Sequence, residues 1–239
     1  MNLDQRLDSR MTSSRVIGLL FLAGFAFYGA GFAMVTSVVE KPHFLASVPD
    51  HRLTLLLGVF LMLVNTVVDL GKGILFFPIL GRHSPRAAQT YLATMVVEVV
   101  MLAAGALMFV LLVPLADRST DSGWATGVGH LVVDANESAY QLGEMLLGLG
   151  AVVLTAVLLR SRLLPRFLAT WGVVGYALLA AGSAADLLGA HVSLALSIPG
   201  GLFEVALGGW LLVKGFEPSA YDAPEAGAQQ MHGEPLLIS

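Results

Sequence analysis

Six ionisable side chains interrupt long apolar stretches of this sequence, and they are the first candidates for chemistry. They are Asp69, Lys72, Glu98, Glu144, Asp186 and Glu204. An ionised carboxylate is costly to place in hydrocarbon, so each of these groups must be neutral, paired, hydrated or functional. Five acids face one base, and Lys72 can pair with only one or two of them. The remaining acids are expected to be protonated or solvated.

The stretch NTVVDLGKG places three polar residues on one helical face. Asn65, Asp69 and Lys72 follow the spacing i, i+4, i+7, which brings side chains to the same side of an α-helix. Two interpretations of Asp69 and Lys72 stay open at this point. They could form a local structural ion pair, or they could take part in binding a ligand.

Small residues indicate the direction in which the other acids point. Gly200 and Gly208 share a helical face with Glu204 in PGGLFEVALGG, and Gly182 shares one with Asp186. Small residues mark close helix contacts in lipid. We therefore expect the carboxylates to lie on packing faces, directed toward a shared interior.

Counting the rise per residue predicts two polar layers. The first layer lies near the middle of the bilayer and holds Asp69, Lys72, Glu98 and Glu204. The second lies nearer the outer face and holds Glu144 and Asp186. Ionisable groups at such depth are functional more often than structural, although hydrogen bonds between helices are an alternative role.

The stretch GHLVVDANESAYQLGE contains a second candidate site, for which the sequence signal is weaker. His130, Asp134 and Glu137 would align along one stripe of a helix, and these side chains could bind a divalent metal at the outer face. The favoured alternative is a solvated amphipathic lead-in to a membrane helix, because His-x3-Asp is far less specific than H-E-x-x-H. No cofactor is predicted.

Several functional classes are excluded or disfavoured. The chain has no cysteine, which removes disulfides, thiolate metal sites and cysteine nucleophiles. No G-x-S-x-G elbow, P-loop or dinucleotide fingerprint occurs. The net charge of −4 and the 13 Lys and Arg residues offer no basic face for nucleic acid. Enzymatic activity is therefore disfavoured, though it stays open.

The elements that must position these residues follow from composition. The chain of 239 residues is 56% hydrophobic and 13% charged, with a mean hydropathy of +0.78, whereas soluble domains carry about 25% charged residues. Six apolar segments reach the roughly 20 residues that a spanning helix needs, at about 16–39, 53–80, 89–115, 138–160, 167–188 and 194–214. The sequence thus predicts an all-α, polytopic membrane protein with six transmembrane helices and the lipid bilayer as its main partner.

The distribution of Lys and Arg predicts the orientation. With the N-terminus inside, nine of these residues fall on cytoplasmic segments and three on outer loops, which favours both termini in the cytoplasm. Residues 1–15 then form a cytoplasmic N-terminal segment, and 16–215 form the six-helix bundle. Residues 216–239 are expected to be a disordered, acidic cytoplasmic tail.

Two runs near the C-terminus carry a family resemblance. LLRSRLLPRFLATWGVVGYALLAAG is followed by LSIPGGLFEVALGGWLLVKGF, and together they span about 158–216. This pattern resembles the bacterial membrane family catalogued as domain of unknown function 4386. The resemblance implies a multi-spanning protein of the bacterial inner membrane and marks Glu144 and Glu204 as members of a recurring pattern. It brings no established activity.

Three functional hypotheses follow. The leading one is a binding or transport protein whose carboxylate-rich interior accepts a proton, a cation or a small polar ligand, with Asp69 and Lys72 as a charge-coupled gate or a proton site. The second is a membrane enzyme that acts on a lipid-like substrate near the outer face. The third is a structural or regulatory subunit. The sequence does not indicate an oligomeric state.

Overall fold

Six long helices dominate the computed structural model, which describes residues 3–118 and 123–221. Each of the six is long and apolar enough to cross a membrane, so the protein is an all-α, polytopic membrane protein, as predicted. The bounds of these helices are α1 Leu3–Val39, α3 Arg52–His83, α4 Pro85–Arg118, α5 Gly123–Ser161, α6 Arg166–Leu187 and α7 Ser193–Val213. Two short helices complete the described chain, α2 Phe44–Ser47 and α8 Pro218–Tyr221.

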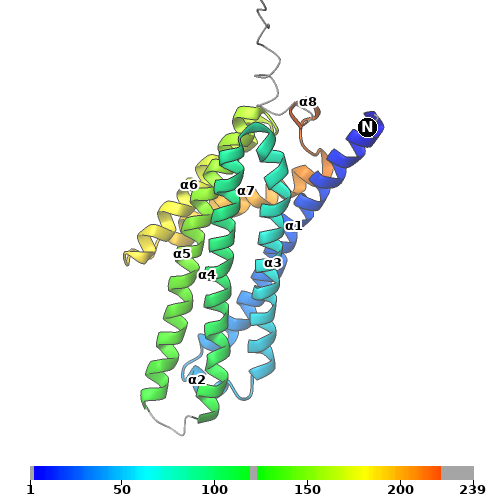
Figure 1. Cartoon of the computed structure of the whole chain (residues 1–239). Coiled ribbons are helices and arrows are strands. Elements are labelled where there is room, and N and C mark those ends of the chain that lie inside the picture. The colour runs from blue at the N-terminus through cyan, green and yellow to red at the C-terminus, as the bar shows by residue number, and fades with distance from the viewer. Residues whose placement is uncertain (1–2, 119–122, 222–239) are drawn as a thin grey trace, which may run out of the picture.

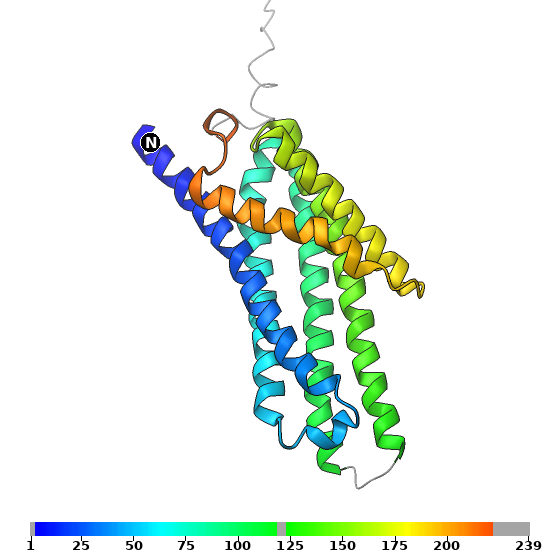
Figure 2. The same cartoon turned by 180° about the vertical axis from the view of Figure 1, so that it is seen from behind.

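The long helices pack as a ring in which each contacts its two neighbours, in the order α1, α3, α4, α5, α6, α7 and back to α1. Helices α1, α3, α4 and α5 run the length of the molecule (Figure 1). The shorter α6 and α7 cover only the end that carries the N-terminus and α8. Viewed from behind, α7 crosses the bundle at a steep tilt, from α1 to the far end of α6 (Figure 2).

The apolar core is divided into two clusters. One cluster lies at the end covered by α6 and α7 and includes Phe76, Met95 and Phe203. The other lies at the end of α2 and includes Met62, Ala106 and Phe109. Along α3, Asn65, Asp69 and Lys72 fall between Met62 and Phe76, and along α4 Glu98 falls between Met95 and Ala106. The polar residues therefore form a layer between two apolar cores.

Glycines set the closest helix contacts, as their spacing predicts. A β-carbon on Gly18 of α1 would lie 2.7 Å from the carbonyl oxygen of Gly208 on α7. A β-carbon on Gly175 of α6 would lie 3.0 Å from the backbone of Gly200 on α7. Only glycine allows such backbone approach, so these contacts hold α7 against both neighbours and place Glu204 between them.

The chain beyond α7 remains packed on the bundle for several residues. Phe216 is 1% exposed and Tyr221 is 9% exposed, and Arg82 of α3 donates a hydrogen bond of 2.8 Å to the carbonyl oxygen of Tyr221. Arg10 of α1 donates to the carbonyl oxygen of Phe216. The segment predicted as a disordered tail from 216 is thus ordered as far as Tyr221, because two aromatic side chains bury against the core. The rest of that predicted tail, 222–239, lies outside the described residues.

Two helices begin earlier than the hydropathy pattern indicates. Helix α1 starts at Leu3, where the apolar segment was placed from residue 16, and α5 starts at Gly123, where it was placed from residue 138. Polar turns begin α1 and turns of mixed composition begin α5, and a search for long apolar runs registers neither. The N-terminus of α1 and helix α8 lie at the same end of the bundle (Figure 1). Which side of a membrane that end faces stays a prediction.

Candidate functional site

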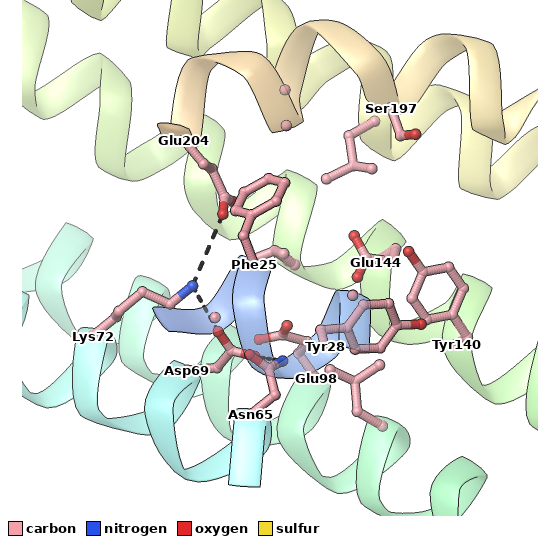
Figure 3. A pocket seen from close by; sticks show the side chains of 17 residues that line it. Phe25, Tyr28, Asn65, Asp69, Lys72, Glu98, Tyr140, Glu144, Ser197 and Glu204 are labelled. Atoms are coloured by element: carbon pink, nitrogen blue, oxygen red, sulfur yellow. Dashed lines mark hydrogen bonds and ion pairs between the residues drawn. The ribbon is translucent and has the colours of Figure 1, made fainter. Parts of the chain in front are cut away.

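A cavity of about 300 Å³ lies at the level of the polar layer. Its walls come from α1, α3, α4, α5, α6 and α7, so every membrane-spanning helix contributes. The buried floor is formed by polar residues of α3 and α4, namely Asn65, Asp69, Lys72 and Glu98. Glu144 of α5 and Glu204 of α7 face the same space (Figure 3). Six of the seven residues predicted to form a ligand or proton site therefore surround one cavity.

Lys72 is the one cation among the cavity residues. Its Nζ atom lies 2.6 Å from Oδ1 of Asp69 and 4.0 Å from Oε2 of Glu204. Nζ also lies 4.7 Å from the ring centre of Phe21, in the geometry of a cation–π contact. Asn65 Nδ2 donates a hydrogen bond of 2.6 Å to Oδ2 of Asp69. Asp69 is thus held by both of its helical neighbours, one turn before and one turn after.

Glu204 is held from a second side. The hydroxyl of Tyr176 on α6 donates a hydrogen bond of 2.8 Å to Glu204 Oε1. This bond and the Lys72 contact use different oxygens of the same carboxylate. Glu204 therefore joins α6, α7 and α3 at the cavity wall, and its side chain keeps an exposed fraction of 15%.

Two buried acceptors in the cavity lack a hydrogen-bond partner among the described residues. They are Oε2 of Glu98 and Oδ1 of Asn65, in residues that are 1% and 5% exposed. A buried acceptor without a partner costs about 1–3 kcal/mol, and more when it is charged. Gly24 on α1 packs closely over Asn65, since a β-carbon there would lie 3.1 Å from Oδ1. Both acceptors therefore suit a ligand that donates hydrogen bonds.

Aromatic side chains form a wall that the sequence analysis did not include. Phe25 and Tyr28 of α1 and Tyr140 of α5 line the cavity, and the rings of Tyr28 and Tyr140 stack with centroids 5.6 Å apart. On the other side of this pair lies a cavity of about 10 Å³, lined also by Met62 and Asn136. The spacing of Tyr140 and Glu144, one helical turn apart, is the signal that could have identified Tyr140.

Asp186, the seventh predicted residue, does not line the cavity. Its carboxylate accepts hydrogen bonds from the backbone N–H groups of Val192 and Ser193, the latter at 3.0 Å, and from the hydroxyl of Ser193. Gln141 of α5 donates to Ser193 Oγ at 3.0 Å. Asp186 therefore satisfies orphan donors at the start of α7, which is a structural role at a helix terminus.

The His130 stripe lies on α5 and leads away from the cavity, since Glu137 is one turn from Tyr140 of the cavity lining and His130 is ten residues from it. His130, Asp134 and Glu137 are all exposed. The ring of His130 packs edge-on against Phe44 of α2, and Glu137 accepts a hydrogen bond of 2.6 Å from Gln141. Within 3–118 and 123–221, no three His, Asp or Glu side chains are gathered so as to hold a metal ion. This geometry gives the predicted metal site no support.

A ring of six spanning helices around a buried, acid-rich cavity defines a multi-pass membrane protein with an internal polar site. The family model described as domain of unknown function (DUF4386) matches residues 16–215. The chain belongs to this family, which confirms the resemblance carried by the C-terminal runs. No curated protein and no solved structure matches the chain.

Proposed function

We propose that this protein binds or transports a proton, a cation or a small polar ligand in its internal cavity. The observation that carries the proposal is a pair of acceptors without a partner among the described residues, Glu98 Oε2 and Asn65 Oδ1. Both residues line a cavity that is also lined by three further carboxyl groups and one amine. Such a donor-poor interior attracts a ligand that brings donors or positive charge. The cavity is also large enough for a small molecule, at the lower end of the usual range of about 300–1,000 Å³.

The ion-pair geometry supports a role in coupling. Lys72 lies between Asp69 on its own helix and Glu204 on α7. A cation that approached Glu204 would compete with Lys72 for that carboxylate, and a proton on Glu204 would release it. Binding would therefore change the link between α3 and α7, which is the kind of differential contact that drives a conformational change.

Flux into proteoliposomes tests the proposal. We expect the protein, reconstituted in lipid vesicles of the inner-membrane type, to take up methylammonium or a monovalent metal cation, or to move protons. Glu98→Gln and Glu204→Gln should each abolish binding and flux, yet leave the protein folded in detergent. Glu40→Gln, at an exposed position outside the cavity, makes the same chemical change as a control.

The structural alternative makes a different prediction. Glu204 connects α7 to α6 through Tyr176. If this carboxylate served only to join helices, replacing it would lower the unfolding temperature of the protein. If binding and flux are absent from the wild-type protein, and Glu204→Gln changes thermal stability alone, the proposed function is wrong.

A further inference from the structure

The cavity has an opening whose position indicates where its ligand comes from. On the α3 and α4 side, Asn65, Asp69 and Glu98 are buried. On the α1 and α7 side, Phe25 is 44% exposed, Gly29 is exposed and Gly201 is half-buried. The cavity is therefore closed toward α3 and α4 and accessible between α1 and α7.

The crossing of α1 and α7 creates this opening. The two helices touch most closely at Gly18 and Gly208, and beyond that point α7 runs away from α1 toward the far end of α6 (Figure 2). The exposed lining residues Phe25 and Gly29 lie along the side of a membrane-spanning helix, not at its end. Exposed apolar residues such as Ile198 and Leu202, 55% and 57% exposed, continue α7 on this face. The opening therefore faces the hydrocarbon of the bilayer.

One side chain occupies the opening. Phe25 lies between the helices, where its ring would be 3.4 Å from a β-carbon on Gly201, and Figure 3 shows it beside Glu204 at the cavity wall. A phenylalanine side chain can rotate about χ1 and χ2, so it can clear the gap without backbone movement. Its ring also offers a face to a cation.

The cavity wall combines two chemistries. Its acceptors include Glu98 Oε2 and Asn65 Oδ1, which are buried atoms of two lining residues and have no hydrogen-bond partner among the described residues. Leu102, Leu147 and Leu179 contribute an apolar wall. A ligand that matches both must carry a hydrogen-bond-donating cationic head and an apolar portion.

We propose that the ligand is an amphiphilic amine, with a primary or substituted ammonium head, which reaches the cavity from the bilayer through the opening between α1 and α7. The head lies against Glu98 and Asn65, and the apolar chain passes Phe25 toward the lipid. This inference rests on the proposed function and narrows the ligand to one chemical class and one route.

Binding in nanodiscs tests the ligand class. The probes are n-octylammonium, methylammonium and n-octanol, each measured against empty nanodiscs of the same lipid. We expect n-octylammonium to bind at least tenfold more tightly than methylammonium, and n-octanol not to bind measurably above the lipid background. Glu98→Gln should weaken n-octylammonium binding at least tenfold.

Substitutions at Gly24 and Gly201 test ligand binding and the route of access without changing a carboxylate, with Gly209 as the control position. Gly24→Ala places a methyl group beside Asn65 Oδ1 and should weaken n-octylammonium binding. Gly209→Ala should not, because no described residue of another helix lies within 4 Å of its β-carbon position. Gly201→Leu fills the opening and should slow n-octylammonium association at least fivefold. Gly209→Leu is the matched control on the same helix.

The outcomes separate this inference from the proposed function. If methylammonium binds as tightly as n-octylammonium and Gly201→Leu has no effect, the cavity is a small-cation site and access from the bilayer is wrong. If n-octanol binds as tightly as n-octylammonium and Glu98→Gln has no effect, the cation proposal is wrong. If no amine or metal cation binds and no proton flux is found, both proposals fail.

Discussion

Lys72 of α3 reaches across the cavity to Glu204 of α7, with Nζ 4.0 Å from Oε2. These helices are not neighbours in the ring, so the contact spans the interior. The shorter contact of Lys72, at 2.6 Å, is with Asp69 one turn earlier on its own helix. The amine is therefore shared between a local partner and a distant one, and only the distant contact depends on how the helices are arranged.

Removal of the amine should destabilise the protein. Lys72→Met leaves Asp69 buried without its charge partner, and breaking a buried pair in this way costs about 3–5 kcal/mol. We expect a lower unfolding temperature in detergent. The double variant Asp69→Asn/Lys72→Met removes both charges and should recover most of the loss. A double variant no more stable than Lys72→Met would show that the pair contributes little.

The crossing of α1 and α7 should be sensitive to one added side chain. Gly18→Val places β- and γ-carbons against the carbonyl oxygen of Gly208, which lies 2.7 Å from the β-carbon position. Overpacking of this kind costs about 1–3 kcal/mol, so the unfolding temperature should fall. Gly209→Val on α7 should leave stability nearly unchanged, because no described residue of another helix lies within 4 Å of the β-carbon position. Equal effects of the two variants would contradict the close contact.

Asp186 should affect stability but not ligand binding. Asp186→Ala removes the acceptor for the N–H groups that begin α7, and loss of such a helix-terminal acceptor costs about 0.5–2 kcal/mol. Thermal unfolding should register this loss. Cation binding by the folded variant should match the wild type, since Asp186 lies outside the cavity lining. If the folded Asp186→Ala variant lost cation binding, Asp186 would have to be counted as part of the binding site.

The segment after α7 should be released by a single substitution. Arg82 donates to the carbonyl oxygen of Tyr221 and lies over its ring, with Cζ 5.3 Å from the centroid. Arg82→Ala should increase the rate of chymotrypsin cleavage after Tyr221 severalfold, because that peptide carbonyl is freed. The control is Arg86→Ala, an exposed position at the start of α4, four residues after Arg82. Unchanged cleavage in Arg82→Ala would mean that Phe216 alone holds the segment.

The number of membrane helices can be predicted from the sequence, because the length of each apolar run shows directly whether it can span a bilayer. Glycine spacing likewise predicts the faces that pack, since close approach needs small residues wherever the partner lies. The depth of a residue is less accessible. Counting 1.5 Å per residue assumes helices along the membrane normal, but α7 is steeply tilted (Figure 2). The prediction therefore separated Glu144 from Glu204, although both line one cavity.

The aromatic wall and the role of Asp186 needed the structure. Tyr28 and Tyr140 meet between helices that are distant in the sequence, and a tyrosine in a membrane helix gives no sign by itself of its partner. Asp186 shares its polar type with the cavity acids, but its partners follow it in the chain, at Val192 and Ser193. The turn after α6 folds back onto the carboxylate of Asp186 and gives it its partners. Helical periodicity does not predict the path of such a turn.

The 39 residues of α5 make a rod about 58 Å long. The hydrocarbon of a bilayer is about 30 Å thick, and about 40–45 Å with its headgroups. Along the membrane normal such a rod is longer than the bilayer, so we expect the α4–α5 hairpin to project into water at the end that carries His130. A protein of 25.2 kDa offers little mass for alignment in electron cryomicroscopy. An antibody fragment raised against that projection would supply a rigid marker without touching the cavity.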